Sequence, residues 1–464
     1  MRIPFFSEAG ALRLSAAVAV VLGLIGGALT VRQPSIALIA CIVVGGVLAL
    51  ALLGDRAFPW MLVLIAVAPW YPFIAEAAEP PIVRQKVLCA AIAAAPLTPW
   101  LWSLALGGRR TRPSRGALLL GILFAGLAIL IYTTLKSVSA LIDSKIVGFV
   151  FIGVAFLCAR RFGDGRGWPA AAFAGVVALA LMGADAYVRA PSHRVGYFVG
   201  YPITYGALVI GLLPLALLFA YGRSRLLAGA LAGGVAAVLI FSESRSSWVA
   251  AAVILVVAVV LQARAGNFRA LGAVLTVVAI LTALVFGTGS LHHIVEQKLS
   301  AKVASSQSVT HRVWSYGYAL ETIGHKPAFG AGAPGFSAEE AANRTSIGAI
   351  DNGYLSISVD MGLVGLLAAC VPIAVALRVL VRCLRLGVTP RYELGLALGI
   401  VAMAVVTAFY DSFYWAQIDL LLGAMGGVLS TRIGRIAATR APAPRRRQAG
   451  VRSRPWGLRE LGWP

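Results

Sequence analysis

The chain has 464 residues, of which 59% are hydrophobic and only 12% are charged, a composition that excludes an ordinary soluble domain. Its formal net charge of +22 does not indicate nucleic acid as a partner, because the basic residues fall in short segments between long apolar runs. The sequence contains no GxxxxGK[ST] phosphate loop, no HExxH and no CxxC pair. We therefore expect no nucleotide, no metal and no other cofactor.

Apolar segments of membrane-spanning length follow one another along almost the whole chain. A helix needs roughly 20 apolar residues to cross a hydrocarbon core of about 30 Å. Helices are expected throughout, because backbone groups in lipid must hydrogen-bond within the protein and nothing here alternates like a barrel strand. The sequence thus predicts an all-α, polytopic integral membrane protein with about 12–14 transmembrane helices. The expected spans are 11–29, 35–53, 57–74, 87–106, 117–135, 146–159, 168–184, 201–221, 226–241, 247–261, 268–286, 354–378, 393–410 and 414–431.

The basic residues are unevenly distributed between the two ends of these spans. With the N-terminus in the cytoplasm, most of the 40 Lys and Arg residues fall on the inner side, as the positive-inside rule describes. This orientation places the long polar loop, residues 287–353, on the outer face. Within the loop, Val313, Tyr316, Leu320 and Ile323 recur at helical spacing and predict an amphipathic helix.

These patterns divide the chain into five regions. Residues 1–189 hold the N-terminal transmembrane helices, and 190–286 hold the helices with the outer-face arginines. The outer loop 287–353 and the C-terminal helices 354–431 follow. The basic tail 432–464 is expected to be disordered in the cytoplasm and to contact anionic membrane lipids.

Three arginines of the outer face lie beside apolar segments: Arg194 in SHRVGYFVGYPITYGA, Arg245 in SESRSSW, and Arg312 in HRVWSYGYALE. A guanidinium binds phosphate oxygens through two parallel hydrogen bonds and stays charged at any physiological pH. Helix N-termini add partial positive charge at the same level. These arginines therefore indicate a site for the pyrophosphate of a lipid carrier. The alternative is that each extends to the headgroups or pairs with a neighbour such as Glu243.

Four motifs occur in order on this face: RVGYFVGYPITYGA, SESRSSW, RVWSYGYALETIGHKPAFGAGAPGF and DNGYLSISVDMGLVG. Together they resemble the O-antigen ligase and polymerase family, over about residues 190–363. The resemblance implies a glycosyltransferase of the bacterial inner membrane that faces the periplasm and uses no nucleotide sugar. The implied donor is an undecaprenyl-pyrophosphate-linked glycan, transferred with inversion. The implied acceptor is lipid A–core in a ligase, or another lipid-linked glycan repeat in a polymerase.

The resemblance also implies roles for individual residues. Arg194 and Arg245 match the arginines that hold the pyrophosphate, and Arg312 matches the arginine of the loop. The family's ligases carry a His, the proposed base, before the Asn of the motif that reads DNGYL here, where this chain has Asp351. Asp351 is a candidate base, with capping of the following helix as the alternative. His311 and His325 are the other candidate bases.

A lipid-linked glycan flippase or polysaccharide exporter is the alternative function. A transferase should hold its three arginines around one outer groove, whereas an exporter should have polar residues along a path through the bilayer. By the predicted boundaries no Lys, Arg, Asp or Glu lies at the centre of a span. This favours the transferase, because ionisable groups within the membrane normally mark a transport path.

Overall fold

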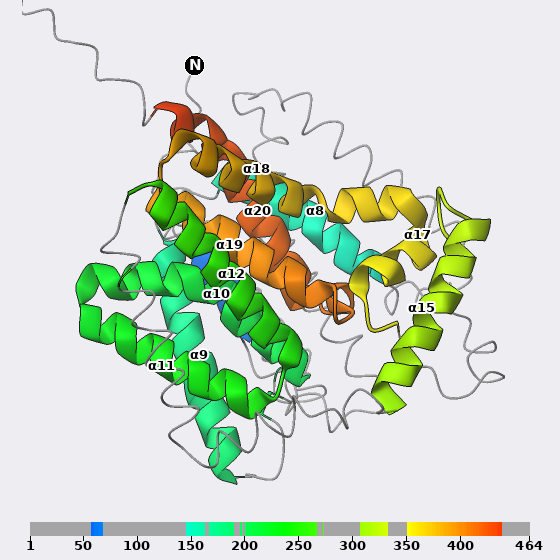
Figure 1. Cartoon of the computed structure of the whole chain (residues 1–464), viewed down its shortest axis with the longest axis horizontal. Helices are drawn as coiled ribbons and strands as arrows, with labels where there is room; N and C mark the ends of the chain where they lie inside the picture. The colour runs from blue at the N-terminus through cyan, green and yellow to red at the C-terminus, as the bar shows by residue number, and fades with distance from the viewer. Residues whose placement is uncertain are drawn as a thin grey trace, which may run out of the picture.

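The computed structural model describes residues 57–67, 145–162, 167–189, 195, 196, 199, 201–266, 272, 307–332 and 350–438 (Figure 1). Every regular element among these residues is a helix, which confirms the all-α fold. The helices are α3 (Ala57–Val67), α8 (Lys145–Phe162), α9 (Trp168–Arg189), α10 (Pro202–Arg223), α11 (Arg225–Ser242), α12 (Arg245–Arg264), α15 (Gln307–His325), α17 (Gly353–Ala369), α18 (Val371–Leu386), α19 (Arg391–Thr407), the 3₁₀ helix η5 (Ser412–Tyr414) and α20 (Ala416–Ala438).

Within the described residues, five helical segments are long and apolar enough to cross a membrane: α9, α10, α11, α12 and the stretch Gly353–Leu386. They coincide with the spans expected at 168–184, 201–221, 226–241, 247–261 and 354–378. Further helices lie on the spans expected at 57–74, 146–159, 393–410 and 414–431. The spans expected at 11–29, 35–53, 87–106, 117–135 and 268–286 lie outside the described residues.

The helices pack closely because small residues lie where they cross. Helix α10 is central and contacts α9, α11, α12 and α19, while α8 runs along α20. At Gly423 and Gly427 of α20, an added Cβ would meet the carbonyl oxygens of Ile152 and Phe156 on α8. Glycines at such positions let two backbones approach within a membrane, where apolar burial alone gives little attraction between helices.

The last turns of α20 differ from the sequence prediction. The helix continues to Ala438, so residues 432–438 are helical although we expected a disordered tail from 432. The Arg432 guanidinium explains the difference, because it donates to Glu393 at 3.3 Å and lies 4.5 Å from the Tyr392 ring centroid. Ile433 packs against the core as well. These contacts hold the end of α20 against the start of α19.

The single span expected at 354–378 is interrupted. Helix α17 contains a non-helical residue, Gly362, with φ 65° and ψ −165°, and Cys370 separates α17 from α18. This backbone conformation is open to glycine and strongly unfavourable for other residues. Hydropathy alone does not reveal the interruption, because Gly362 lies inside the apolar sequence DMGLVG.

A helix is present in the outer loop, as expected, but it buries only part of the predicted apolar face. Helix α15 lies beside α17 (Figure 1). Ala319 is fully buried there, with Tyr316 and Ile323 packed around it. Val313 and Leu320, which we expected on the same apolar face, are 69% and 61% exposed. Among the described helices, α15 makes its main contact with α17, which accounts for its narrow buried face.

Candidate functional site

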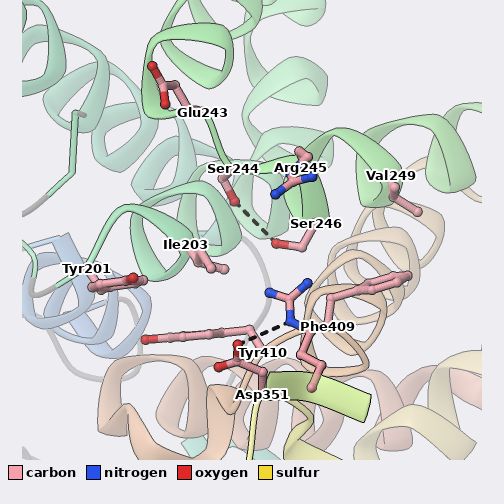
Figure 2. Close-up of a pocket in the computed structure, with 11 residues that line it drawn as sticks. Tyr201, Ile203, Glu243, Ser244, Arg245, Ser246, Val249, Asp351, Phe409 and Tyr410 are labelled. Carbon is pink, nitrogen blue, oxygen red and sulfur yellow. Dashed lines mark hydrogen bonds and ion pairs between the residues drawn. The ribbon is translucent and has the colours of Figure 1, made fainter. Parts of the chain in front are cut away.

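A cavity of about 310 Å³ lies where the ends of several helices meet (Figure 2). It collects residues from four separate parts of the chain: the start of α10, the α11–α12 junction, the outer loop and the segment after α19. Three of the predicted site residues line it together, namely Arg245, Arg312 and Asp351. The described residues that line it are Tyr201, Ile203, Glu243, Ser244, Arg245, Ser246, Val249, Arg312, Asp351, Phe409 and Tyr410.

The motif SESRSSW forms the junction between α11 and α12. Glu243 ends α11 with φ 53°, and it is the one non-glycine residue with positive φ among those the structure describes. Such a conformation costs about 1 kcal/mol or more and is common at functional sites. Trp248 Nε1 donates to Leu239 O at 2.9 Å. This bond ties the first turn of α12 to the last turn of α11, so the junction is rigid.

Arg245 is the first residue of α12, and its side chain lines the cavity. The preceding residue, Ser244, occupies the N-cap position, but its hydroxyl does not cap the helix. It pairs instead with the hydroxyls of Ser246 at 3.3 Å and Ser247 at 2.8 Å. A guanidinium and the positive end of a helix dipole therefore lie on the same side of the cavity, an arrangement suited to an anion.

Arg312 and Asp351 meet across the cavity from Arg245. Arg312 Nε donates to Asp351 Oδ2 at 3.2 Å, and the two side chains are 31% and 28% exposed. Figure 2 shows Asp351 and Arg245 on opposite sides of the cavity. The hydroxyl of Tyr316, one turn after Arg312, donates to the Asp351 carbonyl at 3.1 Å. Two contacts from α15 thus fix both the backbone and the carboxylate of Asp351.

The three residues of the DNG motif have separate roles. Asn352, rather than Asp351, caps α17: its Oδ1 accepts from the amides of Tyr354 at 3.0 Å and Leu355 at 3.1 Å. Capping by Asp351, the alternative reading of that residue, is therefore wrong. A Cβ on Gly353 would lie 2.6 Å from a methyl of Thr407, so a larger residue here would displace Thr407 or the start of α17. The carboxylate of Asp351 faces the cavity because its neighbour caps the helix.

Two tyrosines line the cavity beside Asp351, and the Tyr410 carbonyl accepts from Gly353 N at 3.2 Å. The rings of Tyr201 and Tyr410 stack with centroids 5.6 Å apart and an interplanar angle of 5°. Trp415 Nε1 donates to the Tyr410 hydroxyl at 2.7 Å. A tyrosine hydroxyl has an ordinary pKa of about 10, so this group is neutral across physiological pH. It supplies hydrogen-bonding capacity without charge.

The remaining predicted residues lie elsewhere or outside the described part. Arg194 is outside the described residues, and the next residue, Val195, donates its amide to Phe241 O at 3.3 Å. His311 belongs to α15, but its side chain is not described. His325 is exposed at the other end of α15, about 20 Å from Arg312 at 1.5 Å rise per residue. His325 is absent from the cavity lining, so the geometry favours Asp351 over His325 as the base.

Sequence reasoning did not select Tyr410, Phe409 or Ser246 as site residues. Ser246 follows Arg245 directly, so its place in the first turn of α12 was a usable signal. Phe409 and Tyr410 come at the end of the span expected at 393–410, where aromatic residues are ordinarily assigned to the membrane interface. No sequence feature distinguished them from such residues, because tertiary contacts bring Tyr410 to the cavity: its ring stacks on Tyr201, and its carbonyl accepts from Gly353 N at 3.2 Å.

The fold and the cavity define an all-α polytopic membrane protein with a pocket of two arginines and two acidic residues at its helix ends. Comparison with protein families agrees: residues 230–370 match the model of the O-antigen ligase family. The match supports assignment to that family and indicates a glycosyltransferase of the O-antigen ligase and polymerase type. It spans the α11–α12 junction, α15 and α17, which supply most of the charged cavity residues. No curated protein matches the chain.

Proposed function

We propose that this protein transfers a glycan from an undecaprenyl-pyrophosphate-linked donor to a sugar hydroxyl of an acceptor, at the periplasmic face of the bacterial inner membrane. One observation carries the proposal: Arg245, Arg312 and Asp351, from three separate segments, line one cavity. Two guanidinium groups suit a pyrophosphate, and a carboxylate suits the activation of a hydroxyl. The O-antigen ligase match supports the same chemistry.

The orientation of the helices supports a cavity that faces the periplasm. Three helices have one end at the cavity and an arginine at the other: α10 ends at Arg223, α12 ends at Arg264, and α19 begins at Arg391. The cavity therefore lies at the end of the bundle opposite these arginines. Because arginines collect on the cytoplasmic side of membrane proteins, the cavity end is the outer one.

The donor pyrophosphate would bind Arg245 and the first turn of α12. As the bond between the anomeric carbon and the pyrophosphate oxygen breaks, its electron pair passes to the leaving oxygen. Negative charge thus grows on the pyrophosphate in the transition state. A fixed guanidinium and a helix N-terminus stabilise that charge more than they stabilise the bound donor, which lowers the barrier.

The acceptor hydroxyl would be activated by Asp351. The carboxylate takes the hydroxyl proton as the oxygen forms its bond to the anomeric carbon, on the face opposite the leaving pyrophosphate. A single displacement of this kind inverts the configuration at that carbon. Arg312 would orient the carboxylate through the 3.2 Å contact and extend the positive field towards the donor. Asp351 must therefore lie within hydrogen-bond reach of the acceptor hydroxyl and be basic enough to accept its proton.

The acceptor is either a sugar of lipid A–core, in ligation, or a second lipid-linked repeat, in polymerisation. Deletion of the gene in the native host, followed by gel analysis of surface glycans, separates the two. Loss of polymer from lipid A–core with retention of lipid-linked polymer identifies a ligase, whereas collapse to single repeats identifies a polymerase. If the protein were a flippase, its deletion would instead leave lipid-linked repeats on the cytoplasmic side, and that result would refute glycan transfer.

A further inference from the structure

Residues 327–332, here called the latch, pair with α17 at its interruption. A helix that breaks at Gly362 leaves nearby amides and carbonyls without their regular helical partners. The latch supplies partners on both sides of the break. Four backbone hydrogen bonds join the two segments: Leu363 N to Pro327 O at 2.8 Å, Val364 N to Ala328 O at 3.2 Å, Ala331 N to Val359 O at 2.7 Å, and Gly332 N to Asp360 O at 3.1 Å.

The latch and α17 approach so closely that each needs a glycine at the crossing. Gly362 has φ 65° and Gly330 has φ 71°, both in the region that favours glycine. A Cβ on Gly330 would lie 2.6 Å from the backbone nitrogens of Met361 and Gly362. A Cβ on Gly362 would meet the backbone of Ala328. Neither contact can be relieved by rotating a side chain, because the opposing atoms are backbone.

This pairing also distinguishes the break from the broken helices of ion-coupled transporters. In transporters, the unwound backbone carbonyls of a broken helix coordinate the coupling ion. Here the carbonyls of Val359 and Asp360 accept amides of the latch. The break in α17 therefore binds another segment of the same chain.

The latch fixes one end of α15, and the cavity contacts fix the other. At the cavity end, Arg312 and Tyr316 hold Asp351, which directly precedes α17. Between the two ends, Ala319 is buried in a small core with Ile350 and Val359. Since α17 both follows Asp351 and receives the latch, the position of α15 relative to Asp351 is determined at two points about 20 Å apart along the helix.

We propose that Gly330 and Gly362 are positioning residues for glycan transfer, because the latch they form holds Arg312 in place at the cavity. This inference rests on the proposed function. An added methyl would have to move the two backbones apart by about 1 Å to reach ordinary van der Waals contact. A misplacement of about 1 Å far from the chemistry can lower the rate about 100-fold.

A double-mutant cycle on purified full-length protein tests the positioning role. Gly330→Ala should lower the rate of glycan transfer about 10- to 100-fold, and Arg312→Ala should lower it at least as much. The combined variant should be no slower than Arg312→Ala alone. Once the Arg312 guanidinium has been removed, displacing its helix has no further effect on the rate. Gly324→Ala, whose Cβ would enter open space, is the control and should transfer normally. If the rate losses of Gly330→Ala and Arg312→Ala multiply in the combined variant, the positioning role is overturned.

Cross-linking tests the latch without relying on a destabilised variant. Phe329 and Leu363 flank the paired backbones, and their side chains are 59% and 54% exposed. Cysteines at both positions should form a disulfide on oxidation. A protease site inserted between residues 333 and 349 then provides the readout, because the disulfide should keep the cleaved halves joined. The intact oxidised protein should transfer glycan as fast as its reduced form. Absence of the cross-link, or loss of transfer on locking, would overturn the proposal.

These outcomes remain distinct from failure of the proposed function. The cross-link reports the latch whether or not glycan is transferred. If the cross-link forms but Arg245→Ala and Arg312→Ala both keep full transfer, the proposed site is wrong and the positioning of Arg312 is overturned with it. If those two variants lose transfer while Gly330→Ala keeps it, only the positioning role falls.

Discussion

Substitutions at Asp351 and Asn352 should separate catalysis from stability at two adjacent positions. Asp351→Asn removes the proposed base but preserves the shape of the side chain, so transfer should slow by about 10² to 10⁴. The lost ion pair is partly exposed, with side chains 31% and 28% accessible, and such pairs contribute at most about 1 kcal/mol. Asn352→Ala, by contrast, removes an acceptor of two helix amides and should destabilise by about 1 kcal/mol.

The assay compares transfer rate and thermal unfolding of the two purified variants in the same detergent or nanodisc. Asn352→Ala should unfold at a lower temperature yet retain most of its transfer rate, which is the reverse of Asp351→Asn. Asp351→His should stay active and lose its rate as the pH falls through about 6.5, where imidazole becomes protonated. Full activity of Asp351→Asn would refute the base, and His311 would become the remaining histidine candidate near the cavity.

Three further predictions follow from the described contacts. Arg245→Ala should abolish transfer while Arg264→Ala, at the other end of α12, should not; Arg245→Lys should restore only part of the rate because an ammonium makes no bidentate contact. Gly148→Ala should lower the free energy of unfolding by about 1–3 kcal/mol, since its Cβ would lie 2.7 Å from a backbone oxygen, and thermal unfolding measures the loss. A cysteine in place of Ser305 should react with an impermeant thiol reagent in intact cells, whereas one in place of Arg109 should not; the opposite labelling would reverse the orientation.

The sequence by itself determined the class of fold and much of the chemistry. Hydrophobic residues make up 59% of the chain and fall in repeated long runs. In lipid such runs form helices, because a helix makes its backbone hydrogen bonds internally. Arg245 and Arg312 were identified because a guanidinium at the outer end of an apolar span suits a phosphate, and Asp351 because it stands where the similar family has its His. Such signals lie within short stretches of sequence, so they can be identified without knowledge of the packing.

Tertiary structure alone decided how those residues are paired. The sequence does not show that Arg312 contacts Asp351, because 39 positions separate them. Nor does it show that Asn352 is the cap, since Asp and Asn are equally good at that position. Tyr410 reaches the cavity through its stack on Tyr201 and the bond from Gly353 N to its carbonyl, and the interruption at Gly362 is stabilised by the latch. These features depend on contacts between segments far apart in the chain, which no local pattern encodes.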